Sequence, residues 1–321
     1  MSVLRLIVTV FCLVAGGSIA VAQVAYPTAS IRIIVPFTPG TGIDILARTL
    51  GQKMGDDFKQ SVIVDNRPGA SGNIGTEAAA KAAPDGHTLL MTANTIVLNR
   101  SLFKSIPYDP IKDFVPVAPL AIGRLALVTN PAIGVRTVGD FVALAKREPG
   151  KLNYGSPGNG TPHHLAMELF KSKTGIDVVH VPYKGTAGAV TDLLSGQINV
   201  MFLPVHVALP LAPEKVRILA VATKARTPLL PDQPTLDELG FPGFDADIRY
   251  GVLGPAGMPP EIVARYNSEI GEILRSPDVT ERLAKQGLRS APDTPEAYAA
   301  NIAQDLAKWR NVVTDAKLSV D

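Results

Sequence analysis

Glycine-rich turns are the feature of this sequence best suited to chemistry. Three of them, over residues 37–42, 66–74 and 155–163, follow a short apolar stretch and precede a helical pattern. Such a turn presents free backbone N–H groups and the positive end of a helix dipole, which together attract anions. For any single turn, an ordinary strand-to-helix connection is the simpler interpretation. Two of them facing each other across a cleft would hold a carboxylate without an arginine.

Signatures of catalysis do not accompany these turns. Ser71 and Ser156 lie in glycine-rich segments, but neither has the Gly-x-Ser-x-Gly spacing of a nucleophile elbow. His164 and Glu168 are spaced i, i+4 and could share a metal ion, yet no third ligand stands near them in the sequence. A first-turn histidine beside an exposed glutamate is the simpler interpretation. The sequence therefore predicts no catalytic residue, no metal and no cofactor.

The charge composition argues against a nucleic-acid partner. The 321 residues include 31 Lys+Arg against 29 Asp+Glu, so the chain has no basic surplus with which to neutralise phosphates. Hydrophobic residues make up 46% and charged residues 19%, which excludes an acidic disordered chain. The composition is that of a globular protein.

The first 22 residues have the pattern of an export signal. Arg5 precedes an apolar run over residues 6–14, and small residues end at Ala22, immediately before Gln23. The run is shorter than the roughly 20 residues that span a bilayer. Cleavage between Ala22 and Gln23 removes Cys12, the only cysteine, so the exported chain needs no disulfide. An uncleaved membrane anchor is the alternative.

Behind the turns, short apolar strands alternate with amphipathic helices. Hydrophobic spacing predicts strands over residues 31–37, 61–65, 88–92, 125–128, 152–154, 178–181, 200–203 and 216–223. It predicts helices over residues 43–54, 74–83, 138–147, 162–173, 187–194, 260–273 and 295–313. This alternation predicts an α/β fold with mainly parallel sheets flanked by helices, and the chain length suits two lobes.

Four segments carry a further signal when they are considered in order. They are Pro36–Arg48, Asn66–Gly75, Tyr154–Glu168 and the pair formed by residues 181–185 and 192–196. Together they resemble the motifs of the Bug-type receptors, the periplasmic substrate-binding proteins of tripartite tricarboxylate transporters (TctC-like). The resemblance extends over essentially the whole chain that follows the export signal.

The resemblance implies a two-lobe, periplasmic-binding-protein type II-like fold that closes on a small carboxylate. Lobe one would comprise residues 23–122 plus 248–321, and lobe two, residues 123–247, would be inserted in it. The resemblance also implies a monomer in the periplasm that delivers its ligand to membrane transporter subunits and catalyses no reaction. One alternative is an exported hydrolase of carboxylate esters that uses Ser156 and His164. Another is a ligand-sensing receptor for a signalling kinase, whose fold and site would be the same.

The resemblance also implies which residues contact the ligand. In lobe one these are Phe37, Thr38, Gly40, Thr41 and Asp44, and in lobe two they are Ser156, Gly158, Thr161, His164, Tyr183 and Lys184. Asp44 is expected to brace its own turn at the start of a helix rather than to touch an anion. Thr92 and Asn94 follow the third expected strand, where a polar group would face a cleft.

Two positions depart from the family pattern. Thr41 stands where relatives repeat glycine, and it either adds a hydroxyl donor to the site or adapts the turn. Arg249 stands where relatives commonly carry Trp before Tyr250 and Gly251. The hypothesis is that Arg249 pairs with a second carboxylate and favours a diacid over an aromatic monoacid. The alternative is an arginine that faces solvent.

Overall fold

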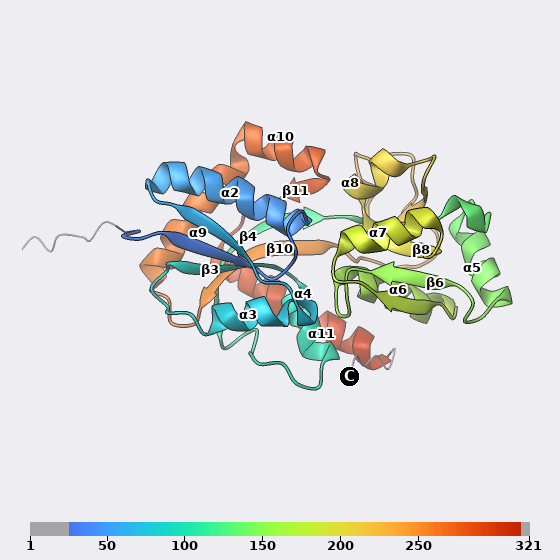
Figure 1. The fold of residues 1–321 in the computed structure, drawn as a ribbon, viewed down its shortest axis with the longest axis horizontal. Helices are drawn as coiled ribbons and strands as arrows, with labels where there is room; N and C mark the ends of the chain where they lie inside the picture. Colours follow the sequence, from blue (N-terminus) through green and yellow to red (C-terminus); the bar gives the residue numbers. More distant parts are fainter. Residues whose placement is uncertain (1–25, 316–321) are drawn as a thin grey trace, which may run out of the picture.

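The computed structural model describes residues 26–315, in which two β-sheets lie side by side along the long axis of the molecule (Figure 1). The expected export signal, its cleavage site and Cys12 lie outside the described residues. Within residues 26–315, no helix is long and apolar enough to cross a membrane.

The first sheet has six strands in the order β11-β4-β10-β3-β1-β2. Their bounds are β1 (Ile31–Val35), β2 (Val62–Asn66), β3 (Thr88–Ala93), β4 (Phe114–Gly123), β10 (Ile248–Pro255) and β11 (Leu288–Ser290). The helices that accompany it are α2 (Gly42–Phe58), α3 (Asn73–Ala80), α4 (Thr95–Leu102), α9 (Pro260–Arg275), α10 (Pro277–Lys285) and α11 (Pro295–Asp315).

The second sheet has five strands in the order β7-β6-β8-β5-β9. Their bounds are β5 (Leu125–Thr129), β6 (Asn153–Ser156), β7 (Val179–Pro182), β8 (Val200–Pro204) and β9 (Arg217–Val221). The accompanying helices are α5 (Val138–Arg147), α6 (Pro162–Thr174), α7 (Thr186–Ser195) and α8 (Val205–Ala208). All strands of this sheet come from the stretch between β4 and β10, so the chain passes between the sheets twice.

The α/β class and the two-sheet arrangement are confirmed, but both sheets are mixed rather than mainly parallel. β1 pairs in parallel with β2 and β3, and β6 pairs in parallel with β7 and β8. In contrast, β10 runs antiparallel to β3 and β4, and β5 runs antiparallel to β8 and β9. Neighbouring strands that run parallel must be joined by a crossover, usually a helix. β5 and β10 arrive directly from the other sheet without such a crossover, so they can pair in the antiparallel direction.

Local capping fixes two helices of the second half. Thr137 and Asp140 form a reciprocal capping box at the start of α5. The Thr161 side chain accepts a hydrogen bond from the His164 N–H at the start of α6, and Gly175 ends α6 with φ 67°. α5 occupies the residues that the sequence predicts.

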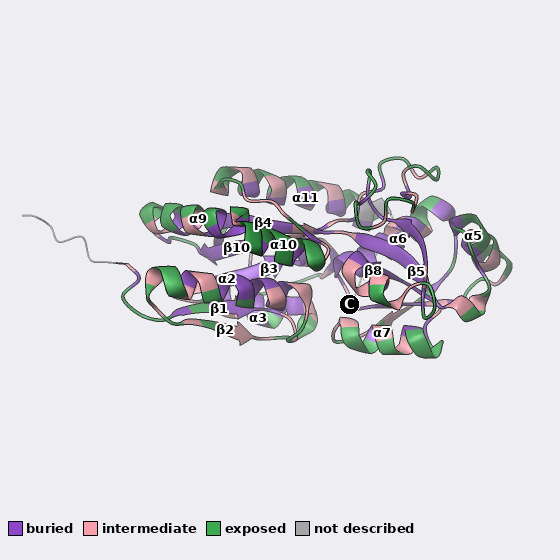
Figure 2. Cartoon of the chain, turned by 90° about the horizontal axis from the view of Figure 1, so that it is seen from above, coloured by how far each residue is buried: buried purple, intermediate pink, exposed green. Residues whose placement is uncertain are grey.

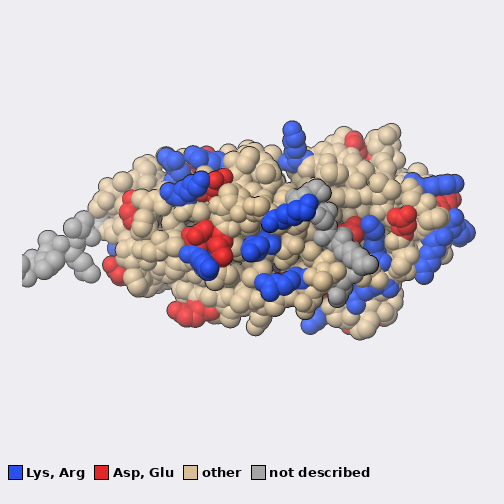
Figure 3. All heavy atoms as spheres, turned by 90° about the horizontal axis from the view of Figure 1, so that it is seen from below, with Lys and Arg blue, Asp and Glu red and all other residues tan. Residues whose placement is uncertain are grey.

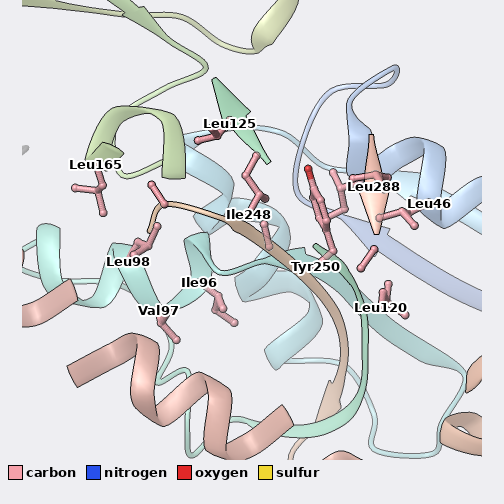
Figure 4. Close-up of a cluster of buried hydrophobic side chains, with 14 of the residues drawn as sticks. Leu46, Ile96, Val97, Leu98, Leu120, Leu125, Leu165, Ile248, Tyr250 and Leu288 are labelled. Carbon is pink, nitrogen blue, oxygen red and sulfur yellow. The ribbon is translucent and has the colours of Figure 1, made fainter. Parts of the chain in front are cut away.

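One hydrophobic core continues from the first sheet into the second. Figure 4 shows Leu98 and Ile248 of the first half in the same buried cluster as Leu125 and Leu165 of the second. The inner strands are buried between helices whose outer faces are exposed, whereas the edge strands β2 and β7 are partly exposed (Figure 2). On the face shown in Figure 3, basic side chains are scattered and acidic side chains lie among them.

Candidate functional site

A cavity of about 380 Å³ lies where the two halves of the molecule meet. It takes its lining from both halves: Phe37, Gly40, Thr41, Gly42, Ile43, Ala93, Thr95, Ile248 and Tyr250 from the first, and Pro157, Thr161, Pro162, His163, Gly185, Thr186, Ala187, Val190, Pro204, His206 and Val207 from the second. Among these lining residues of the described chain there is no Lys, Arg, Asp or Glu. Most of the cavity wall is apolar. Any electrostatic field inside the cavity therefore comes mainly from the dipoles of backbone groups.

Three helices line this cavity with their first two residues, and α4 adds its first residue, Thr95. The first residues of α2 (Gly42, Ile43), of α6 (Pro162, His163) and of α7 (Thr186, Ala187) all line it. In Figure 1 these helix starts meet where the halves adjoin. Each helix N-terminus carries the equivalent of about +0.5 elementary charge and several free N–H groups. The convergence creates a site for an anion in which no cationic side chain takes part.

Asp44 holds the turn between β1 and α2 in place. Its carboxylate accepts hydrogen bonds from the Gly40 N–H at 2.9 Å, from Asn66 Nδ2 at 3.0 Å and from Arg48 Nε at 3.0 Å. The Asn66 amide also donates to the Phe37 carbonyl at 3.0 Å. The carboxyl group therefore braces the turn, as the sequence predicts, while the backbone of Gly40 faces the cavity.

The electrostatics of Asp44 follow from these contacts. Burial by itself raises the pKa of a carboxyl group, but here hydrogen bonds from Arg48, from the Gly40 amide and from Asn66 outweigh it and hold the Asp44 pKa below its usual value. Asp44 is 3% exposed. It is therefore ionised at neutral pH, and its negative charge stabilises the turn.

Thr41 and Thr38 complete this wall. The Thr41 hydroxyl donates to the Thr38 carbonyl at 3.0 Å, so it adapts the turn even though Thr41 lines the cavity. Thr38 is not part of the lining, but a Cβ built on Gly185 would lie 2.9 Å from Thr38 Oγ1. The turn after β1 therefore touches the turn before α7 directly.

The glycine-rich turn between β6 and α6 forms the opposite wall. Thr161 Oγ1 donates to the Gly158 carbonyl at 2.8 Å, and the Gly160 N–H donates to His164 Nδ1 at 3.1 Å. Of the four residues expected from this turn, Thr161 lines the cavity. The other three residues are buried outside the lining: Ser156, Gly158 and His164.

Ser156 and His164 belong to a buried stack beneath the turn. The His180 ring lies 4.2 Å from the His164 ring and 4.6 Å from the Tyr154 ring, and its Nε2 is 2.7 Å from Ser156 Oγ. Burial lowers the pKa of His164 to about 4 and that of His180 to about 3. Ser156 is fully buried, and its imidazole partner is His180 rather than His164.

Glu168 is buried rather than exposed. It accepts hydrogen bonds from the Tyr154 hydroxyl and from Lys171 Nζ, which stabilise its charge inside the fold. In residues 26–315, no group of three His, Cys, Asp or Glu side chains is placed to hold a metal ion. His164 and Glu168 thus serve separate hydrogen-bond networks.

The remaining expected contacts from the second half lie beside the cavity. Tyr183 donates its hydroxyl to Asp192 at 2.5 Å, and this contact, with burial as the larger cause, raises the pKa of Tyr183 to about 12. Lys184 is exposed. Neither side chain is part of the lining, whereas the next residues, Gly185 and Thr186, are.

Sequence reasoning missed five polar side chains of the lining, which are Thr95, His163, Thr186, His206 and Tyr250. His163 is adjacent to the expected His164, and a rotation of about 100° per helical residue separates their directions. Thr95 is adjacent to Asn94 at the end of β3. In both cases the signal in the sequence was correct to within one residue.

Asn94 and Arg249 lie in a second cavity, of about 370 Å³, next to α11. Arg249 Nη1 is 2.8 Å from Asp305 Oδ1 of α11, and Asn94 Nδ2 donates to the Asp247 carbonyl at 3.2 Å. Neither residue lines the first cavity. Thr92, also expected at the site, is buried, and its hydroxyl lies 3.3 Å from the Ala93 carbonyl.

Asp247 has a buried carboxyl group at the return from the second half to the first. Its Oδ1 is buried without a hydrogen-bond partner. Burial, with help from Asp245, raises the pKa of Asp247 to about 6, while Arg124, Arg249 and Arg289 act in the opposite direction. Because the folded pKa exceeds the unfolded value of about 3.9, stability falls as the pH rises from about 4 to about 6.

The variant Asp247→Asn is therefore expected to unfold less readily than the parent chain at pH 7.5, by about 1–2 kcal/mol. Near pH 4 the parent carboxyl is protonated in the folded state, so the difference there is expected to vanish. Urea unfolding at pH 4, 6 and 7.5 measures both. A variant that is no more stable than the parent at pH 7.5 would contradict the cost assigned to this buried charge.

Comparison with known proteins agrees with this geometry. Residues 46–318 match the family described as "Tripartite tricarboxylate transporter family receptor". The chain is 37% identical over 323 residues to Protein BugT of Bordetella pertussis, with 99% of each chain covered.

Two solved structures with bound acids are also similar. Rpa4515 of R. palustris, solved with adipate, has a TM-score of 0.88 at 33% identity, covering 92% of this chain and 100% of that one. MatC of Rhodopseudomonas palustris, solved with malate, has a TM-score of 0.83 at 30% identity, covering 90% of this chain and 100% of that one. Each of these two structures holds a small carboxylic acid. The chain has a two-sheet fold, a cavity lined by both of its halves and a family match over most of its length. It belongs to the Bug-type, TctC-like receptors of tripartite tricarboxylate transporters.

Proposed function

We propose that this protein captures a small organic carboxylate in the cavity between its halves and delivers it to a tripartite tricarboxylate-type transporter in the membrane. The observation that carries the proposal is the convergence of the α2, α6 and α7 N-termini on one cavity whose described lining holds no charged side chain. Backbone amides can bind a carboxylate there and release it again, because no ion pair has to be broken. The adipate and malate bound by the two similar proteins support the ligand class.

In this proposal the protein works as two lobes that close on the ligand. Lobe one is residues 23–122 plus 248–321, lobe two is residues 123–247, and the hinges lie at the two crossings between the sheets. Only the closed form brings the α2 dipole of lobe one and the α6 and α7 dipoles of lobe two to the same anion. Ligand binding therefore favours closure. The exported chain, from Gln23, acts in the periplasm as a monomer.

Hydrolysis of esters is the weaker alternative. A nucleophilic serine must reach its substrate and a base. Ser156 is fully buried and lies outside the cavity lining, and its hydroxyl is engaged with His180 and with the Gly158 backbone. These contacts support a structural role for Ser156.

Thermal unfolding of the chain from Gln23 tests the proposal. Small mono-, di- and tricarboxylates are added, with the corresponding amides as neutral controls. A ligand at 100 times its dissociation constant adds about 2.7 kcal/mol to stability, which raises Tm by about 5 °C in a chain of this size. Unfolding and refolding the chain first removes any copurified acid. If no acid then raises Tm and an ester is hydrolysed, the receptor proposal is wrong.

Uptake in cells separates delivery from sensing. Deleting the gene is expected to abolish uptake of the acid that raises Tm. Normal uptake together with a lost transcriptional response to that acid would instead favour the signalling receptor.

A further inference from the structure

One polar side chain of the cavity lining is buried and unpaired, yet its polar atom remains accessible. Tyr250, in β10, lines the cavity and is 6% exposed. Among residues 26–315, no group forms a hydrogen bond with its hydroxyl. The unpaired side-chain atoms of His163 and Thr95 are fully enclosed, whereas the Tyr250 hydroxyl retains accessible surface. Such a hydroxyl can bond to a molecule that enters the cavity.

The hydroxyl lies beside the start of α2. A Cβ built on Gly42, the first residue of α2, would be 3.1 Å from Tyr250 Oη. Gly42 also lines the cavity. Figure 4 shows the Tyr250 ring among apolar side chains such as Leu46 and Leu288, with the hydroxyl at the far end of the ring. These neighbours offer no acceptor, so a partner for the hydroxyl has to come from the cavity.

The first turn of α2 is likewise open. Thr41 is its N-cap residue but makes no side-chain cap, and its hydroxyl donates to the Thr38 carbonyl instead. α6 differs in this respect, because the Thr161 side chain caps it. The first N–H groups of α2 therefore remain available as donors next to the Tyr250 hydroxyl.

Tyr250 is suited to act as a donor to an anion. Burial raises the pKa of its hydroxyl above the usual value of about 10, so the group stays protonated at neutral pH. A phenol hydroxyl offers one proton, and a carboxylate only accepts. Hydrogen bonds to an ionised acceptor are stronger than those between neutral groups.

Resting on the proposed carboxylate-binding function, we infer that Tyr250 is a ligand-binding residue whose hydroxyl donates a hydrogen bond to the carboxylate that the first N–H groups of α2 bind. Tyr250 and Gly42 both belong to the first half of the molecule. The first half therefore holds the carboxylate before α6 and α7 of the second half close on it. Tyr250 also follows Ile248, the first residue of β10, by two positions, so this contact lies next to the return crossing between the sheets.

Tyr250→Phe tests the inference because it removes only the hydroxyl oxygen. Calorimetry at pH 7.5 with benzoate, malate, adipate and citrate measures affinity. The acid that the parent chain binds most tightly is expected to bind at least tenfold more weakly to the variant, as for the loss of a hydrogen bond to a charged group. Because Tyr250 stays protonated, the ratio of the two affinities is expected to be constant from pH 6 to 9.

Thermal unfolding without acid separates ligand contact from a structural role. The Tyr250 hydroxyl has no bond to lose within the described chain, so Tm of Tyr250→Phe is expected to equal or exceed that of the parent.

Tyr298→Phe is the matched control. Tyr298 is 7% exposed, and no residue of the described range forms a hydrogen bond with its hydroxyl, but it lines the second cavity rather than the first. Tyr298→Phe is expected to keep both the affinity and Tm of the parent.

The outcomes separate this inference from the proposed function. If Tyr250→Phe binds within twofold of the parent, the inference is wrong while the carboxylate receptor stands. Weaker binding that comes with a lower Tm in the absence of acid, or an equal loss in Tyr298→Phe, would also overturn the inference. If the refolded parent chain binds none of the acids, the receptor proposal itself fails.

Discussion

Replacing Gly160 with alanine is expected to weaken carboxylate binding about 100-fold. Gly160 belongs to the turn before α6, and a Cβ at this position would lie 2.5 Å from Asn99 Oδ1 and 3.2 Å from Leu102 Cδ1 of α4. α4 and α6 come from opposite halves of the molecule. The added methyl group would therefore lie in the contact that these halves make with each other. Closure would require Asn99 to move.

Asn99 has little freedom to move. It is 1% exposed, and its Nδ2 donates to the Ser71 carbonyl at 3.0 Å and to Asn73 Oδ1 at 2.7 Å. Breaking these buried bonds costs about 1–3 kcal/mol each, and 2.7 kcal/mol corresponds to about 100-fold in affinity. If the lobes move as proposed, the unliganded variant is expected to avoid the clash by remaining open. Its own stability is therefore expected to fall only by the strain of the positive φ, which is 72° at Gly160.

Gly175→Ala is the matched control for Gly160→Ala. Gly175 has a similar φ of 67°, but a Cβ there would meet nothing within 4 Å. It is expected to lose a comparable amount of stability and no affinity. Calorimetry with an acid that raises Tm gives the affinities, and small-angle scattering with and without that acid reports closure. Affinity of Gly160→Ala within threefold of the parent would show that closure does not bring Gly160 against Asn99.

Asp44→Asn is expected to lower the free energy of unfolding by about 2 kcal/mol at pH 7 and ligand affinity by at least tenfold. The carboxylate accepts from the Gly40 amide, from Asn66 and from Arg48, and hydrogen bonds to a charged group contribute about 1.5–3 kcal/mol each. An asparagine accepts through one oxygen only and turns an NH₂ group toward the remaining donors. The turn that presents Gly40 and Thr41 to the cavity then loses its brace.

The stability effect of Asp44 should depend on pH with a defined sign. Its folded pKa lies below the unfolded value of about 3.9. The stabilisation is therefore complete above about pH 5 and is lost as the pH falls through the folded pKa. The difference between parent and Asp44→Asn is expected to be constant from pH 6 to 8 and to shrink below pH 4. Urea unfolding across this range measures it.

Asp140→Asn provides the control for a helix-start carboxylate outside the cavity. Asp140 accepts from the Arg136 and Thr137 amides at the start of α5, and its pKa is likewise lowered. This variant is expected to lose some stability and no affinity. Equal losses of affinity in Asp44→Asn and Asp140→Asn would mean that general destabilisation, rather than the turn after β1, weakens binding.

The sequence predicted best those elements whose ends are fixed locally. α5 begins and ends at the expected residues because Thr137 and Asp140 cap it. α6 starts at Pro162 after the Thr161 cap and ends before Gly175. Capping depends on a few adjacent residues, so the positions of these helix ends can be predicted from the sequence.

The sequence analysis missed β4 and β10, which join the two halves. β4 contains Pro116 and Pro119, and proline argues against a sheet interior because it donates no hydrogen bond. Its ladder with β10 tolerates them through two irregularities in register. Only a partner strand more than 100 residues away in the chain makes such a segment a strand.

For the site, the sequence by itself predicted two glycine-rich turns, before α2 and α6, that both line the cavity. Tertiary structure alone decided which side chains line the cavity. His163 rather than His164 lines the cavity, and Arg249 is turned to Asp305 while its neighbours Ile248 and Tyr250 line the cavity. Turn chemistry is local, whereas the direction of a side chain depends on helix rotation, strand alternation and the element packed against it. The packing of segments far apart in the chain therefore fixed the chemistry of the cleft.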